Sequence, residues 1–167
     1  MQHTVQLEDS GRSVVRWYEI DPTVNTPVLL RKGEIGTQSR GNFFFNAAIS
    51  PDRRVDPPRG VSQFGDSFVI QYNVSSGEND IFPRIVAGSS LSGEPLTFRE
   101  LKGGAEAYID ATCPDSTVVC RWSSYAGAAP DPRPITEDRG MVWGTNQYTD
   151  ENGVKGRFRS WIFGVQP

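Results

Sequence analysis

The chain has 167 residues, with 17 Lys and Arg against 20 Asp and Glu and a formal net charge of −3. This balance argues against a dedicated nucleic-acid binder, which needs concentrated Lys and Arg to neutralise phosphates. The length predicts one domain with a real hydrophobic core. A single histidine, His3, near one end of the chain, argues strongly against a His-dependent catalytic triad or a multi-His metal site within one chain.

Short apolar or alternating runs bounded by Gly, Pro, Asp and Asn recur along the chain, and they predict strands rather than helices. The predicted strands are residues 13–20, 27–35, 42–50, 67–74, 82–89, 96–101, 122–129, 140–148 and 157–165, with 4–7 as a further candidate. The third run is expected to stop at Pro51 and Asp52, before a polar loop over 53–62. The sequence therefore predicts an all-β protein.

An internal repeat favours one all-β architecture over the others. Residues 44–52 line up with 124–131, and each segment is followed by a variable loop, a Gly-led strand, an acidic turn and a strand that begins near an Arg. Small residues such as Ala47 and Ala48 suit the crowded central axis of a β-propeller, where the innermost strand of each blade lies. The repeat of ~75 residues exceeds the ~40–50 of a compact blade. We expect the excess to form loop insertions at 53–62 and 103–120.

Several segments also form a familiar series: 16–20, 47–52, 71–76, 82–84, 121–125 and 143–148. Together they resemble the repeats of large exported bacterial β-propeller proteins, which are sialidase-like in architecture. Where many of those repeats read Arg-Trp-Gly-Asp-Tyr, this chain has Ser123 and Ser124, and the Asp-box pattern of true sialidases is absent.

The resemblance implies an incomplete propeller of about 2.5–3 blades within a single domain over residues 1–167. It divides the chain into a partial blade (1–40), a full blade (41–104), an insertion with the cysteine pair (105–120) and a partial blade (121–167). Closed propellers have ~4–8 blades, and an open fragment exposes long strand edges. Other blades, or self-association by edge pairing or strand exchange, are therefore the expected partners.

The cysteines bear on the compartment. Cys113 and Cys120 bracket six residues, a spacing that suits a disulfide-closed loop in an oxidising compartment. Two unpaired thiols are the alternative, and a metal site is favoured least because it would need two further ligands. No apolar run approaches the ~18–20 residues of a membrane span. The first residues lack a secretory signal, so export implies that this chain is a mature piece or a fragment. We expect an extracellular or periplasmic location without membrane insertion.

Five residues are the candidate ligand-binding set: Arg121, Trp122, Tyr125, Asn46 and Arg84. Aromatic rings beside amides form a carbohydrate-binding platform, and Arg offers fixed donors for carboxylates. The blander interpretation places such aromatics between blades and such arginines in salt bridges. A third pattern, Asn73-Val74-Ser75, matches an N-glycosylation acceptor.

No pair of carboxylates stands out as catalytic, and Asp52 and Asp131, each after a Pro, are predicted to cap turns. The leading hypothesis is a non-catalytic exported β-propeller module with a structural, assembly or ligand-binding role, and without a cofactor or metal. The alternatives are a glycan-binding, lectin-like propeller, with carbohydrate as its partner, and a sialidase-like glycoside hydrolase.

Overall fold

The computed structural model describes residues 1–167 apart from 24, 57–60, 111–112, 114–119, 134–139 and 151–156. The described residues form ten strands: β1 (Gln2–Gln6), β2 (Ser13–Asp21), β3 (Val28–Ile35), β4 (Phe43–Asp56), β5 (Val61–Ser76), β6 (Ile81–Ser90), β7 (Thr97–Lys102), β8 (Gly127–Pro130), β9 (Val142–Thr149) and β10 (Phe158–Val165). The all-β prediction is confirmed. No helix that could cross a membrane occurs in this part of the chain.

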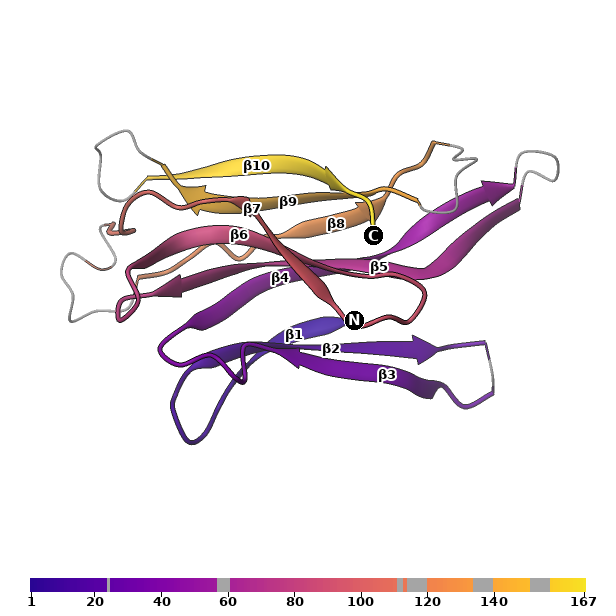
Figure 1. Cartoon of the computed structure of the whole chain (residues 1–167), viewed down its shortest axis with the longest axis horizontal. Helices are drawn as coiled ribbons and strands as arrows, with labels where there is room; N and C mark the ends of the chain where they lie inside the picture. The colour runs from indigo at the N-terminus through magenta and orange to yellow at the C-terminus, as the bar shows by residue number, and fades with distance from the viewer. Residues whose placement is uncertain (24, 57–60, 111–112, 114–119, 134–139, 151–156) are drawn as a thin grey trace.

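The strands form three antiparallel sheets stacked as layers (Figure 1). The first sheet has the order β1-β2-β3, the central sheet β4-β5-β6-β7 and the third sheet β8-β9-β10, so each follows chain order from edge to edge. The first strand of each sheet (β1, β4 and β8) lies next to the first strand of the neighbouring sheet, since β4 contacts both β1 and β8. A hydrogen bond from the Gln2 Nε2 to the Ala47 carbonyl oxygen, at 2.6 Å, joins the first two of these strands.

Strand β5 explains why the sheets stack. Its side chains alternate between the two faces of the central sheet, as the period of two in a strand requires. Phe68, Ile70 and Tyr72 pack against Trp17 and other residues of the first sheet. On the opposite face, Val69 belongs to the core shared with the third sheet. The central sheet is therefore covered by apolar contacts on both faces.

The β4–β5 hairpin corrects one prediction. The strand was expected to stop at Pro51 and Asp52, but β4 continues to Asp56 and β5 begins at Val61. The pairing register shifts between Pro51 and Arg53, so a bulge accommodates the proline, which has no N–H to donate, without ending the strand. The prediction of a loop over 53–62 is therefore wrong at both of its ends, with 57–60 outside the described residues.

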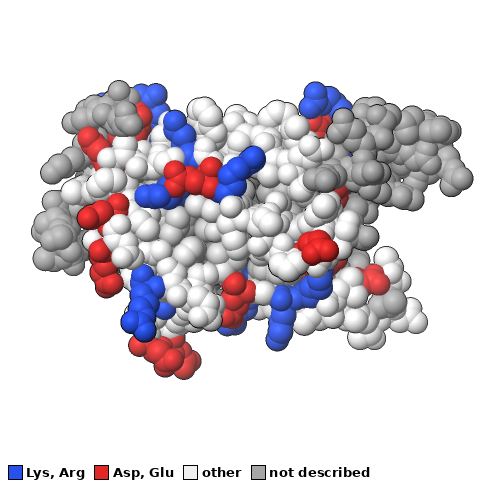
Figure 2. Space-filling view, in the orientation of Figure 1, with Lys and Arg blue, Asp and Glu red and all other residues white. Residues whose placement is uncertain are grey.

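The predicted strand over 122–129 is also shorter than expected. Only Gly127–Pro130 pairs with β9, because the preceding segment turns its tryptophan toward the central sheet instead of continuing the ladder. Charged side chains of both signs are interspersed on the face shown in Figure 2, and the described Lys and Arg residues do not gather into one patch there.

Candidate functional site

A cluster of buried amide side chains lies between the central and third sheets. It consists of Asn46 on β4, Gln71 and Asn73 on β5, and Asn146 on β9, and we call it the amide cluster. Gln71, Asn73 and Asn146 are almost completely inaccessible to solvent. Asn46 has a φ of 50°, a left-handed conformation that asparagine tolerates, at the register shift between Phe45 and Ala48.

The amide cluster ties four strands together. Asn46 Nδ2 donates to Asn146 Oδ1, and Asn146 Nδ2 donates to the Asn46 carbonyl oxygen, both at 2.9 Å. Gln71 Nε2 donates to the carbonyl oxygens of Gly127 (3.4 Å) and Thr145 (3.2 Å), which belong to β8 and β9. Buried amides are stable only when such partners are present. The cluster therefore fixes the register of the third sheet on the central one.

Asn73 connects the amide cluster to Trp122. Its Oδ1 accepts from the Trp122 Nε1 at 2.9 Å and from the Asn46 Nδ2 at 3.3 Å. Its Nδ2 donates to the carbonyl oxygens of Arg84 (3.0 Å) and Gln147 (2.6 Å). These four bonds use the hydrogen-bonding capacity expected of a buried asparagine. They hold the indole ring of Trp122 in one orientation.

The Trp122 ring forms one wall of a cavity of about 300 Å³, which we call the aromatic pocket. Three further rings line it, those of Phe45, Phe82 and Tyr108. The Phe45 and Tyr108 rings both stand at 84° to the indole of Trp122, with centroids 6.1 and 5.1 Å away. The remaining lining residues are Ser75, Ser76, Gly77, Asp80, Ile81, Pro83, Ala107 and Cys120.

Three polar groups of these walls, including the Trp122 indole N–H, are already bonded to the protein. The Tyr108 hydroxyl donates to Asp110 Oδ2 at 2.6 Å. Burial, together with this bond to a carboxylate, raises the pKa of Tyr108 to about 12, so the phenol stays neutral at ordinary pH. The Ser76 hydroxyl donates to the Gly41 carbonyl oxygen at 2.7 Å. The pocket is thus lined by aromatic rings and, at Asp80, by a single described carboxylate.

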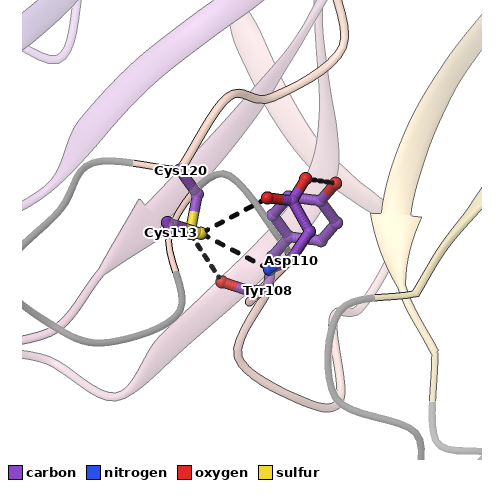
Figure 3. Close-up of a disulfide and its surroundings, with 4 residues drawn as sticks. All are labelled: Tyr108, Asp110, Cys113 and Cys120. Atoms are coloured by element: carbon purple, nitrogen blue, oxygen red, sulfur yellow. Dashed lines mark hydrogen bonds between the residues drawn. A yellow bond between two sulfur atoms is a disulfide. The ribbon is translucent and has the colours of Figure 1, made fainter.

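A disulfide between Cys113 and Cys120 stands at the edge of the aromatic pocket (Figure 3). Their Cα atoms are 4.8 Å apart. The Asp110 N–H donates to Cys113 Sγ at 3.4 Å. Cys120 Sγ lies 3.1 Å from the Tyr108 carbonyl oxygen, and this is a van der Waals contact, since a disulfide sulfur carries no hydrogen to donate. The bridge brings the segment of Tyr108 beside that of Trp122. Such a bond points to an oxidising, extracytoplasmic environment.

The structure separates the five residues predicted to bind a ligand. Trp122 lines the aromatic pocket, and Asn46 is joined to it through Asn73. Arg84 offers its carbonyl oxygen to Asn73, while its guanidinium pairs with Glu100 at 2.7 Å. Arg121 is exposed, and Tyr125 is 84% exposed; neither lines the pocket.

Three of the residues that form the site were not in the predicted set. The alternation of side chains along a strand could have indicated Phe45, because its neighbour Phe44 faces the core and Phe45 therefore points to the opposite side. Phe82 is the second residue of β6, and its place near the start of a strand gave no sign that its ring lines a pocket. Tyr108 lies in a connection without periodicity, so nothing in the sequence pattern indicated its role.

The arginines and carboxylates that were considered for catalysis are distributed over the molecule. Arg16 pairs with Glu34 in the first sheet, and Arg159 pairs with Asp150 beside the third. In the part of the chain that the structure describes, no three His, Cys, Asp or Glu side chains are grouped as metal ligands.

The two predicted turn caps have different partners. Asp131 Oδ1 accepts from the N–H of Arg133 at 2.9 Å, a local cap. Bonds from the side chain and backbone of Arg133, and from the Trp143 indole, hold the pKa of Asp131 well below its usual range. The carboxylate of Asp52 instead accepts from the distant Gly140 N–H at 3.1 Å. Both carboxylates are buried in structural contacts.

A scan against protein-family models, a search of curated proteins and a search of solved structures each found no match to this chain.

Proposed function

We propose that this chain is a non-catalytic, exported module of the β-propeller type that binds a ligand in the aromatic pocket. The observation that carries the proposal is the pocket itself, a cavity of about 300 Å³ walled by four aromatic rings and held by a buried hydrogen-bond network. Small-molecule sites are concave, mostly apolar and largely pre-formed. The bonds of Asn73 and the disulfide supply this pre-formation.

The sheet arrangement supports the propeller part of the proposal. Each sheet is a meander in chain order, the sheets stack face to face, and their first strands are neighbours. Successive propeller blades have this arrangement. In this proposal the first sheet is a partial blade within 1–40, the central sheet is a full blade within 41–104, and the third sheet is a partial blade within 121–167.

The acidic residues support binding rather than glycoside hydrolysis. Hydrolysis uses two carboxyl groups ~5–9.5 Å apart on either side of the scissile bond. Among the described residues that line the aromatic pocket, Asp80 is the one carboxylate. Glu19 is paired with Arg31, and Asp131 with Arg133, in other parts of the molecule.

A ligand screen tests the binding function. The purified chain is offered a glycan array and a panel of small neutral, anionic and cationic solutes, with tryptophan fluorescence as a second readout. We expect at least one class to bind, and Phe82→Leu to weaken that binding because it removes a ring from the pocket wall. Phe98→Leu is the matched control, since Phe98 is an exposed ring on β7 outside the pocket.

Two results would contradict the proposal. One is turnover of fluorogenic glycosides by the chain, which would make it a hydrolase. The other is a ligand whose affinity is equal in the wild type and in Phe82→Leu but lower in Phe98→Leu, since that ligand would occupy another surface.

Assembly is a second candidate function, favoured by the outer face of the third sheet. Ile162 is 73% exposed there, and Trp143 40%, although both belong to regular strands. Their cross-strand partners, Thr145 and Gly164, leave this face without charge at those positions. Another sheet, from a second copy or from other blades, would cover it. Sedimentation velocity tests this: Ile162→Lys should lower self-association at micromolar concentration, and a wild type that is monomeric there contradicts it.

A further inference from the structure

We infer that the ligand of the aromatic pocket carries a quaternary ammonium group, such as the trimethylammonium of choline. The inference rests on the proposed binding function of the same pocket and names the chemistry of its ligand. It depends on the ring geometry, on the charge of the pocket lining and on a comparison with a second aromatic pair in this chain.

The ring geometry suits a cation. An aromatic ring is negative on its face and positive at its edge, so a cation is attracted to a site that offers several faces. Phe45 and Tyr108 both stand at 84° to Trp122, and Phe82 adds a fourth ring to the lining. Walls at right angles surround a roughly spherical group better than a flat one. Trimethylammonium is such a group.

The charge of the lining has the matching sign. Asp80 contributes a carboxylate, and no Lys or Arg occurs among the described residues that line the pocket. An anionic ligand would meet repulsion there. A bare metal ion is also a poor match, because Ca²⁺ and Mg²⁺ require about six oxygen ligands.

A neutral sugar fits the pocket less well than an organic cation does. Each sugar hydroxyl that leaves water needs a hydrogen-bond partner in the site. The indole N–H of Trp122, the Tyr108 hydroxyl and the Ser76 hydroxyl are all bonded to other protein groups. A trimethylammonium group needs no such partner, because its surface is methyl groups and its charge is satisfied by the rings and by Asp80.

A second aromatic pair in the same molecule shows what this geometry holds. The Lys102 Nζ lies 5.0 Å from the ring centroids of both Tyr148 and Trp161. Those two rings meet at 89° with centroids 6.5 Å apart, close to the angle between Tyr108 and Trp122. Among the described residues, no Lys or Arg is recorded over the rings of the aromatic pocket. The aromatic pocket differs in that the Tyr108 and Trp122 rings lie closer together, with centroids 5.1 Å apart, and both also pack against Phe158. The cavity of about 300 Å³ beside them leaves room for a cation from outside.

Isothermal titration of the whole chain with choline chloride tests the inference. The matched probe is 3,3-dimethylbutan-1-ol, which has the same shape as choline but no charge. We expect choline to bind at least about tenfold more tightly. Phe82→Leu should weaken choline binding about two- to fivefold, the range of one exposed cation–π contact. Asp80→Asn should also weaken it, whereas Glu78→Gln, in the same turn but outside the lining, should not.

The comparison of choline with its neutral isostere on the wild-type chain keeps the test informative if variants fold poorly. Phe98→Leu, which removes an exposed ring on β7 outside the pocket, should leave choline affinity within about twofold of the wild type. Phosphatidylcholine vesicles are offered in parallel with free choline. They distinguish a lipid headgroup from a free solute, and binding of either source with the expected Phe82→Leu loss supports the inference.

Two outcomes overturn the inference and are distinguishable from each other. Equal affinity for choline and its neutral isostere, or binding of methyl glycosides but not choline, overturns the cation assignment and leaves the pocket as a binding site. Binding of none of the solutes, glycans or vesicles overturns both the inference and the proposed function.

Discussion

Replacement of Asn73 by alanine should destabilise the protein strongly, because this one side chain makes four hydrogen bonds at 0% exposure. It accepts from Trp122 and Asn46 and donates to the carbonyl oxygens of Arg84 and Gln147. A typical bond contributes about 1 kcal/mol net, and a buried partner left unsatisfied costs about 1–3 kcal/mol. The contact with Asn46 is long at 3.3 Å and counts for less. We therefore expect a loss of about 3–4 kcal/mol in the free energy of unfolding.

The assay is urea unfolding followed by tryptophan fluorescence and by far-UV circular dichroism. Asn79→Ala is the matched control, because the Asn79 amide also donates twice, to the Arg40 carbonyl oxygen at 3.0 Å and to Asn42 Oδ1 at 2.8 Å, but in an exposed turn. Water replaces those bonds, so the control should lose less than about 1 kcal/mol. Equal losses in the two variants, or a loss below about 1 kcal/mol for Asn73→Ala, would refute the assignment of the amide cluster as the clamp between the sheets.

Three further predictions concern packing, pH and the disulfide. Gly144→Ala should lower the free energy of unfolding by about 1–3 kcal/mol, because its new methyl group would overlap the buried Phe163 ring of β10. Gly77→Ala, with open space around it, should change that free energy by less than about 0.5 kcal/mol in the same urea assay. The pKa of Asp131 is lower in the folded chain than its ordinary 3.8. Its ionised form therefore stabilises the fold above that pH, and this contribution is lost as the pH falls through the folded pKa. In acid titrations, the stability difference between wild type and Asp131→Asn should be constant near neutrality and shrink below about pH 4. Reduction of the bond between Cys113 and Cys120 removes a loop constraint worth about 2.5 kcal/mol by the chain-entropy relation, so it should lower the free energy of unfolding by about that amount. Urea midpoints with and without dithiothreitol measure the loss, and Cys113→Ser is the control variant that should not respond.

The fold was predictable wherever a strand has a period of two. Residues 67–74 were expected to form a strand, and β5 covers them with alternate side chains in two cores. The prediction failed where proline was taken as a terminator, since the bulge after Pro51 lets β4 continue. It also failed at Trp122, where a tertiary hydrogen bond to Asn73 overrides the strand pattern. Local pattern cannot represent a partner 49 residues away.

The candidate site was predictable only in part, for a similar reason. Trp122 and Asn46 were singled out as an aromatic ring beside an amide, and the structure joins them through Asn73. Asn73 itself was noted only as part of a glycosylation pattern, although its complete burial leaves the amide inaccessible in the folded chain. Tyr108 is positioned next to the Cys113–Cys120 bridge rather than by a strand. Its role therefore depends on a covalent contact that periodicity does not encode.

The two Pro-Asp sequences make different contacts in the folded chain. Asp131 folds back on its own turn, whereas Asp52 accepts from the distant Gly140 N–H before β9. The strands that surround the two sequences share a meander order. The aromatic pocket, in contrast, takes Tyr108 and Trp122 from the connection between β7 and β8, which has no counterpart between β3 and β4. We therefore expect substitutions in that connection to change the ligand specificity of the proposed pocket, as substitutions of the strand residues Phe45 and Phe82 should.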